Sequence, residues 1–111
     1  MSEPAHDAAV VRILTNDQSP RNPKGAGFLV TPQHVLTCAH VVNDALCRKK
    51  GSVDRPKLTI FLDFPFLPSR PLVQATVQDW FPMQEKVIFG EQEDIALLEL
   101  VSNTPLPAGV H

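Results

Sequence analysis

The residues best suited to proton chemistry lie in two short segments of the chain. The first segment, residues 25–42, reads GAGFLVTPQHVLTCAHVV and contains His40. The second, residues 93–100, reads EDIALLEL and contains Asp94. Histidine is the side chain whose unperturbed charge change falls near neutral pH, and a carboxylate beside its Nδ1 fixes the tautomer and stabilises the imidazolium. The two segments therefore supply a candidate acid–base pair.

Zinc binding is the competing chemistry for the same region, because His34, Cys38, His40 and Cys47 are residue types that tetrahedral zinc sites use. Their spacing matches none of the paired short-spaced patterns of structural zinc sites, so we expect no metal and no cofactor. Cys38 is also a poor nucleophile beside His40, because alternate strand positions give it no oxyanion site, and we expect it to be a small buried core residue. With two cysteines in the chain, we expect thiols.

Prolines and glycines cut the chain into short apolar segments, which favours an all-β fold. Eleven prolines in 111 residues make long helices improbable, and the length indicates one domain. We predict a six-stranded antiparallel Greek-key barrel. The six predicted strand segments are Val10–Thr15, Gly25–Thr31, Val35–Val42, Lys57–Phe64, Leu72–Phe81 and Asp94–Val101.

Local patterns within these segments refine the prediction. Residues 72–81 alternate most plainly between apolar and polar positions, as a half-buried strand requires, and residues 58–64 repeat this with Leu58 on the apolar side. Apolar residues four apart within Val41–Cys47 permit at most two helical turns. The basic triplet at positions 48–50 fits a solvated face.

Charge and hydropathy exclude several classes of partner. The formal net charge of −2 provides no footprint for nucleic acid or an anionic membrane, so we expect neither partner. No apolar run is long enough for a membrane span, and the first residues lack the features of a signal peptide. We therefore expect a cytoplasmic protein.

Taken together, the two segments resemble the chymotrypsin-like (trypsin-like) serine protease family. The N-terminal barrel of that family has a Gly-x-Gly-Phe strand, a Thr-Ala-Ala-His segment and then an Asp-Ile-Ala-Leu-Leu strand start, in the order found here. The resemblance covers about 90 residues of this chain. It implies that His40 is the general base and that Asp94 is the buried carboxylate holding its ring. Glu91 and Glu93 are weaker candidates, because the acid of the family directly precedes the Ile-Ala-Leu-Leu run.

Departures from the family pattern narrow the resemblance. Secreted members join the strand before the histidine to the residue after it by a disulfide, and here those positions hold Gly25 and Val41. An Ile-Val-Gly-Gly-like start for zymogen activation is also missing, and Cys38 occupies an alanine position. The chain is therefore most similar to intracellular bacterial members and to the high-temperature-requirement proteases.

The resemblance implies a nucleophile and an oxyanion site that this sequence does not supply. In the family both come from a Gly-Asp-Ser-Gly turn in a second barrel, and the serines found here have no such context; they are Ser2, Ser19, Ser52, Ser69 and Ser102. We expect residues 1–9 to be a disordered lead-in, 10–101 the barrel, and 102–111 an exit linker toward a missing second barrel. The chain alone is then the inactive N-terminal half of a serine endopeptidase acting on protein or peptide substrates.

Two other functions stay open from the sequence. One is a non-catalytic protein-interaction module that retains the half-protease fold. The other is a stand-alone enzyme that uses Cys38 or a site shared across a dimer. We expect an apolar surface near His40, Asp94 and residues 104–110, because a second barrel would cover it. The expected partners are therefore a second protease barrel, another protein chain or a second copy of this chain.

Overall fold

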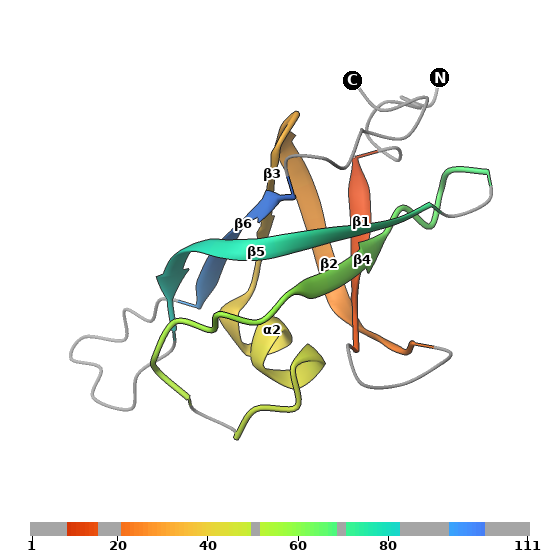
Figure 1. Cartoon of the computed structure of the whole chain (residues 1–111). Coiled ribbons are helices and arrows are strands. Elements are labelled where there is room, and N and C mark those ends of the chain that lie inside the picture. Colours follow the sequence, from red (N-terminus) through yellow and green to blue (C-terminus); the bar gives the residue numbers. More distant parts are fainter. Residues whose placement is uncertain (1–8, 16–20, 50–51, 69–70, 83–93, 102–111) are drawn as a thin grey trace.

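Six antiparallel strands close into a barrel, and one short helix lies at one end of it (Figure 1). The computed structural model describes residues 9–15, 21–49, 52–68, 71–82 and 94–101. The elements are β1 (Val10–Leu14), β2 (Pro23–Thr31), β3 (His34–Thr37), α2 (Ala39–Ala45), β4 (Ile60–Asp63), β5 (Leu72–Phe81) and β6 (Ile95–Leu100). The order around the barrel is β1-β2-β3-β6-β5-β4.

The all-β prediction and the six-stranded antiparallel barrel are confirmed, and each predicted segment overlaps one strand. The prediction of strand through Val42 is wrong, because the helix already begins at Ala39. Strand alternation ends at this point: residues 41, 42, 45 and 46 are all buried, which is a helical spacing. Leu58 is also not on the apolar face of β4, since it precedes the strand and is exposed.

The predicted termini mostly lie outside the described residues: this applies to 102–111 and to all of the lead-in except Ala9. The part of the chain that the structure describes contains no helix with the length and apolar character needed to cross a membrane.

The barrel interior is filled by the alternate, inward-facing residues of five strands and by one side of α2. On β5 the buried positions are Val73, Ala75 and Val77, and the residues between them are exposed. Alternation of this kind places every second side chain inside the barrel. The other core residues are Val11, Ile13, Val35, Val41, Val42, Ala45, Leu46, Ile60, Leu62, Phe64, Ala96, Leu98 and Leu100.

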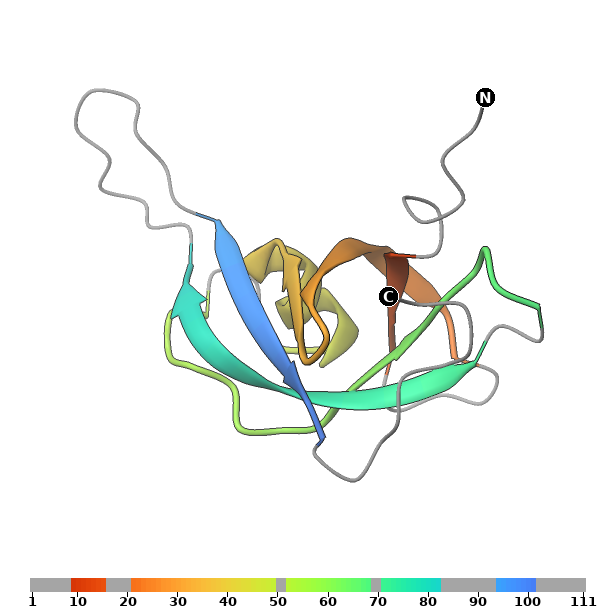
Figure 2. The ribbon, with the colours of Figure 1, turned by 90° about the horizontal axis from the view of Figure 1, so that it is seen from above.

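Strand β2 differs from the others because glycines stand where core side chains would otherwise point inward. A Cβ atom on Gly25 would lie 2.6 Å from Cγ2 of Val41, a separation that real Cβ atoms essentially never show. The absent side chain lets α2 pack directly against β2, so the helix lies across one end of the barrel (Figure 2). Gly25, the first glycine of the Gly-x-Gly-Phe strand, therefore has a packing role.

Helix α2 ends in a compact hydrogen-bonded cap. Cys47 adopts a positive φ of 56°, the amide of Cys47 donates to the carbonyl of Asp44, and the amide of Arg48 donates to that of Asn43. These two bonds satisfy carbonyl groups that the end of a helix leaves without intrahelical partners. The seven-residue helix is thus fixed at its C-terminal end as well as by its buried side.

An ion pair joins β1 to β4 where the barrel closes. Arg12 and Asp63 are directly opposed in the antiparallel register. Nε of Arg12 donates to Oδ1 of Asp63 at 2.9 Å, and Nη2 donates to Oδ2 at 2.6 Å. The hydrogen bond to Asp63 raises the pKa of Arg12 above its ordinary value. This two-pronged contact holds the two strands in one register.

Candidate active site

His40 and Asp94 meet at the end of the barrel that α2 covers. His40 is the second residue of α2, which follows β3, and Asp94 immediately precedes β6. Strands β3 and β6 are antiparallel neighbours with Thr37 opposite Ala96, so the end of β3 and the start of β6 lie side by side. The predicted proximity of His40 and Asp94 follows from this pairing.

The Asp94 carboxylate contacts His40 with both of its oxygens. Oδ1 accepts a hydrogen bond from the backbone amide of His40 at 2.9 Å, and Oδ2 is hydrogen-bonded to Nδ1 of the ring. The amide is one of the helix N-terminal donors that lack an intrahelical acceptor, and the N-cap side chain of Cys38 does not bond to it. Asp94, at the start of β6, therefore caps α2 and orients the imidazole at the same time.

This contact determines which ring nitrogen of His40 can accept a proton. An ionised carboxylate is only an acceptor, so Nδ1 carries the hydrogen and Nε2 of the neutral ring keeps its lone pair. Within the described residues, Nε2 has no hydrogen-bond partner. The His40 side chain is 60% exposed, whereas that of Asp94 is 18% exposed. The pair thus combines a shielded carboxylate with an accessible base.

Two contacts of neighbouring residues hold the turn between β3 and α2. The hydroxyl of Thr37 donates to the carbonyl of Ala26 at 2.8 Å, which ties the end of β3 to β2. Val41, the residue after His40, is buried against Gly25 of β2. Because His40 lies between these two anchored residues, its backbone has little freedom to move away from Asp94.

Cys38 is exposed, so the expectation that it is a buried core residue is wrong. Val35 is buried, Leu36 exposed and Thr37 buried, and continuing this alternation turns Cys38 outward. Partial burial of the thiol, followed by the charge of Asp94, raises the pKa of Cys38. Activated cysteine nucleophiles show the opposite shift, which argues against Cys38 as the nucleophile of a stand-alone enzyme.

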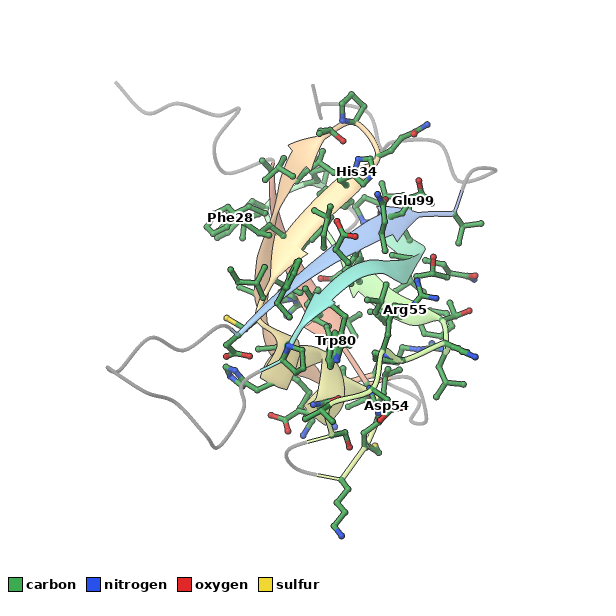
Figure 3. All side chains as sticks on the ribbon, turned by 90° about the vertical axis from the view of Figure 1, so that its left-hand side faces the viewer. Phe28, His34, Asp54, Arg55, Trp80 and Glu99 are labelled. Carbon is green, nitrogen blue, oxygen red and sulfur yellow. The ribbon has the colours of Figure 1, made fainter. Side chains whose placement is uncertain are left out.

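The four residues considered as zinc ligands do not form one cluster. His34 lies at the opposite end of β3 from Cys38, where Nδ1 is 2.7 Å from Oγ1 of Thr31 and Nε2 is 2.8 Å from Oε1 of Gln78 (Figure 3). Both ring nitrogens of His34 are therefore engaged. Among the residues described, the group whose ligand atoms approach within 4.8 Å of one another consists of Cys38, His40 and Asp94.

Among the described residues, no serine adds a nucleophile to this site. Ser52 is described, and its hydroxyl donates to the carbonyl of Lys49 at 2.6 Å. Ser2, Ser19, Ser69 and Ser102 lie outside the described residues. The same holds for Glu91 and Glu93, the alternatives to Asp94.

Exposed apolar side chains cover the outer side of the barrel next to the pair. Phe28, Leu36 and Leu97 are consecutive cross-strand partners on β2, β3 and β6, and Ile95 opposes Phe81 of β5. Phe28, Leu36, Ile95 and Phe81 are exposed, and Leu97 is half-buried. We call these five residues the apolar face; Figure 3 labels Phe28 within its view of this side. The face borders the site, because Ile95 follows Asp94 and Leu36 is two residues before Cys38.

Two contributions to the site were not predicted from the sequence. One is the backbone amide of His40. Nearly every residue has such an amide, so no sequence pattern marks this one. The other is the exposed thiol of Cys38, which the alternation of Val35, Leu36 and Thr37 does signal. Comparisons of the chain with protein-family models and with curated proteins find no match.

Proposed function

We propose that this chain provides the acid–base half of a trypsin-like serine endopeptidase. His40 acts as the general base, Asp94 orients it, and the serine nucleophile and oxyanion donors come from a segment or chain that completes the site. The observation that carries the proposal is the double contact of Asp94 with the amide and Nδ1 of His40, which leaves an exposed Nε2.

The geometry suits one proton-transfer cycle. Nε2 of His40 accepts the proton of the serine hydroxyl as its oxygen attacks the peptide carbonyl, and the ring becomes an imidazolium. Asp94 stabilises that charge through Nδ1–H. The same nitrogen then gives the proton to the departing amine, so the carbon–nitrogen bond breaks without release of an unstable amide anion. A water molecule repeats the sequence on the acyl-enzyme.

Two features of the barrel support the same assignment. Gly25 and Val41 stand at the positions that the family resemblance pairs in a disulfide, and they are in contact here. Strand order β1-β2-β3-β6-β5-β4 is compatible with the Greek-key barrel expected of an N-terminal protease domain. Packing of a valine against a glycine takes the place of the covalent link.

The apolar face supports a protein partner as the source of the missing half. Large exposed apolar patches are uncommon on monomers and mark interaction sites. Because this face borders His40 and Asp94, a chain that covers it is positioned to bring a serine to Nε2.

The test is covalent labelling of the naturally occurring polypeptide or complex that contains these 111 residues, using a fluorophosphonate reagent. We expect a labelled serine on the segment or chain that completes the site, and loss of labelling in His40→Ala; the half-buried His34, at the opposite end of β3, supplies the control variant His34→Gln. Labelling that survives His40→Ala, or a complex in which no serine reacts, would contradict the proposal.

A non-catalytic interaction module is the second candidate, and the apolar face is the observation that favours it. The two functions differ in what the partner contributes. A bound partner without a reactive serine, together with unchanged affinity in His40→Ala, assigns the module; a reactive serine assigns the protease half.

A further inference from the structure

We propose that Cys38, His40 and Asp94 form a binding site for a zinc-type divalent cation. The ligands are Sγ of Cys38, one ring nitrogen of His40 and a carboxylate oxygen of Asp94. These atoms lie within 4.8 Å of one another and come from the residue before α2, from α2 itself and from the start of β6.

The approach of the three atoms is close to what a tetrahedral ion needs. Zinc bonds of about 2.3 Å to sulfur and about 2.0–2.2 Å to nitrogen and oxygen place ligand atoms roughly 3.3–3.6 Å apart. Rotation of the exposed Cys38 side chain can bring Sγ about 1 Å closer, which closes the remaining gap. Nδ1 of His40 and Oδ2 of Asp94 are already in hydrogen-bond contact, closer than two ligands of one ion, so an ion bound through both atoms replaces their hydrogen bond and moves them apart.

The donor set selects the class of metal. A thiolate and an imidazole favour zinc and related transition ions, whereas magnesium and calcium prefer sites made of oxygen atoms. A divalent cation also compensates the two negative charges that a Cys38 thiolate and the Asp94 carboxylate bring together. The chemistry therefore points to Zn²⁺, with Co²⁺ as its spectroscopic substitute.

The carboxylate of this site is held in place before any ion arrives. Oδ1 of Asp94 accepts the amide hydrogen of His40 at 2.9 Å, which orients the other oxygen toward the ring. Loss of a hydrogen bond of this kind to a metal ligand typically weakens metal affinity about 10–100-fold. Because Cys38 and His40 are exposed, the fourth coordination position stays open to water.

Binding is an exchange of ligands without oxidation or reduction. Bonds from zinc to water break, bonds to sulfur, nitrogen and oxygen form, and the Cys38 thiol releases its proton to solvent. If Nδ1 binds the metal, the ring hydrogen resides on Nε2; if Nε2 binds, its lone pair is occupied. In both cases His40 can no longer accept a proton at Nε2.

The regulatory consequence rests on the proposed function: zinc would switch off the protease reversibly by occupying its general base. The binding site itself does not depend on that function. An ion bound here would also compete with a serine approaching Nε2, so zinc inhibition and assembly with the nucleophile-bearing partner would oppose each other.

The test is titration of the 111-residue chain with Zn²⁺ by calorimetry and with Co²⁺ by absorption spectroscopy. We expect one ion per chain and a sulfur-to-cobalt charge-transfer band in the near ultraviolet. Cys38→Ser should abolish that band and weaken Zn²⁺ binding at least tenfold, roughly the loss seen when even an outer-shell partner is removed. Asp94→Asn should weaken binding as well, and Cys47→Ser is the matched control that should leave both signals unchanged.

Circular dichroism of each variant separates loss of ligand from loss of fold. A wild-type cobalt complex without the sulfur band, or zinc affinity retained in a folded Cys38→Ser variant, would overturn the site. Metal binding in a protein that never assembles into a protease would leave the site standing and contradict only the proposed function. An active protease that binds no zinc would contradict only the site.

Discussion

Two aspartates of this barrel make the same kind of contact and produce different chemistry. Asp63 uses both oxygens on Arg12 across the β1–β4 seam, and Asp94 uses both oxygens on His40 where β6 meets α2. The Arg12 side chain is 33% exposed against 60% for His40, and Asp63 is 9% exposed against 18% for Asp94. The carboxylate contact is common to both pairs, so the residue that faces the carboxylate decides which chemistry the pair can perform.

A guanidinium stays charged at every pH at which proteins are handled, whereas an imidazole changes charge near neutrality. The Arg12 pair can therefore only hold strands together, and the His40 pair can transfer a proton. One region is a structural clamp, and the other holds an imidazole in a fixed orientation that suits the base we propose. Separate substitutions in the two pairs should affect stability in one case and catalysis in the other.

The largest expected effect is that of Asp94→Asn on catalysis in the assembled protease that we propose. Without the carboxylate, the ring is no longer held with Nε2 as acceptor, and kcat should fall about 10⁴-fold, as for the equivalent loss in serine proteases generally. Initial rates of peptide ester hydrolysis measure this. Glu99→Gln, an exposed change on the same strand, should leave kcat within a factor of two; a similar loss there would contradict a specific role for Asp94.

Removing the clamp should instead reduce stability. Arg12→Ala leaves the buried Asp63 carboxylate without its partner, and the free energy of unfolding should fall by about 2 kcal/mol. This is less than for a fully buried pair because a third of the Arg12 side chain is exposed. Urea unfolding gives the value, with the exposed Arg55→Ala as control. Equal losses in the two variants would show that the clamp contributes nothing specific.

The pH dependence of the clamp follows from the direction of its shift. Because the hydrogen bond to Asp63 raises the pKa of Arg12, the contribution of Arg12 is complete below the ordinary arginine value and is lost only as pH rises beyond it. The stability difference between wild type and Arg12→Ala should therefore stay constant from pH 7 to pH 10. A steady decline across that range would contradict this assignment.

A smaller effect is expected where α2 packs on β2. Gly25→Ala places a methyl group against Val41 and should cost about 1–2 kcal/mol of unfolding free energy through overpacking. It should also loosen the contact between His40 and Asp94, because Val41 anchors that backbone. The double variant Gly25→Ala/Val41→Ala should recover most of the loss. No recovery would mean that the glycine is needed for another reason.

The smallest effect concerns the thiol beside the pair. Burial and the Asp94 charge raise the pKa of Cys38, so less of it is thiolate at a given pH and alkylation should be slower than in the urea-unfolded chain. Its rate should keep rising with pH beyond the ordinary cysteine value. Asp94→Asn should speed alkylation a few-fold, as followed by peptide mass spectrometry. A rate unchanged by Asp94→Asn would remove the charge from the explanation.

The strands of the barrel could be predicted because the patterns that mark them lie within short stretches of the sequence. Alternation along Leu72–Phe81 and turn residues between the apolar segments define strands without reference to distant contacts. The start of α2 could not be placed in this way. Ala39 and His40 continue an apolar strand as plausibly as they begin a helix, and the choice depends on Asp94 accepting the His40 amide from a distant strand.

The candidate site divides along the same line. His40 and Asp94 were predicted as a pair from two motifs in a known order, and pairing of β3 with β6 brings their side chains into contact as expected. Cys38 was wrongly predicted to be buried, because a small apolar residue beside a core strand is more often buried than exposed. The clamp of Arg12 and Asp63 was not predicted at all, since the sequence does not show which charged residues of different strands face each other.

The account depends most on the hydrogen of the His40 ring, and nitrogen NMR of the 111-residue chain reports it directly. At a pH where the ring is neutral, we predict ¹⁵N shifts of a protonated Nδ1 and an unprotonated Nε2 for His40, with a one-bond coupling to hydrogen at Nδ1 alone. Asp94→Asn should collapse this into the average of two exchanging tautomers. A wild-type His40 ring that carries its hydrogen on Nε2, or that already exchanges freely, would contradict the assignment of His40 as an oriented base.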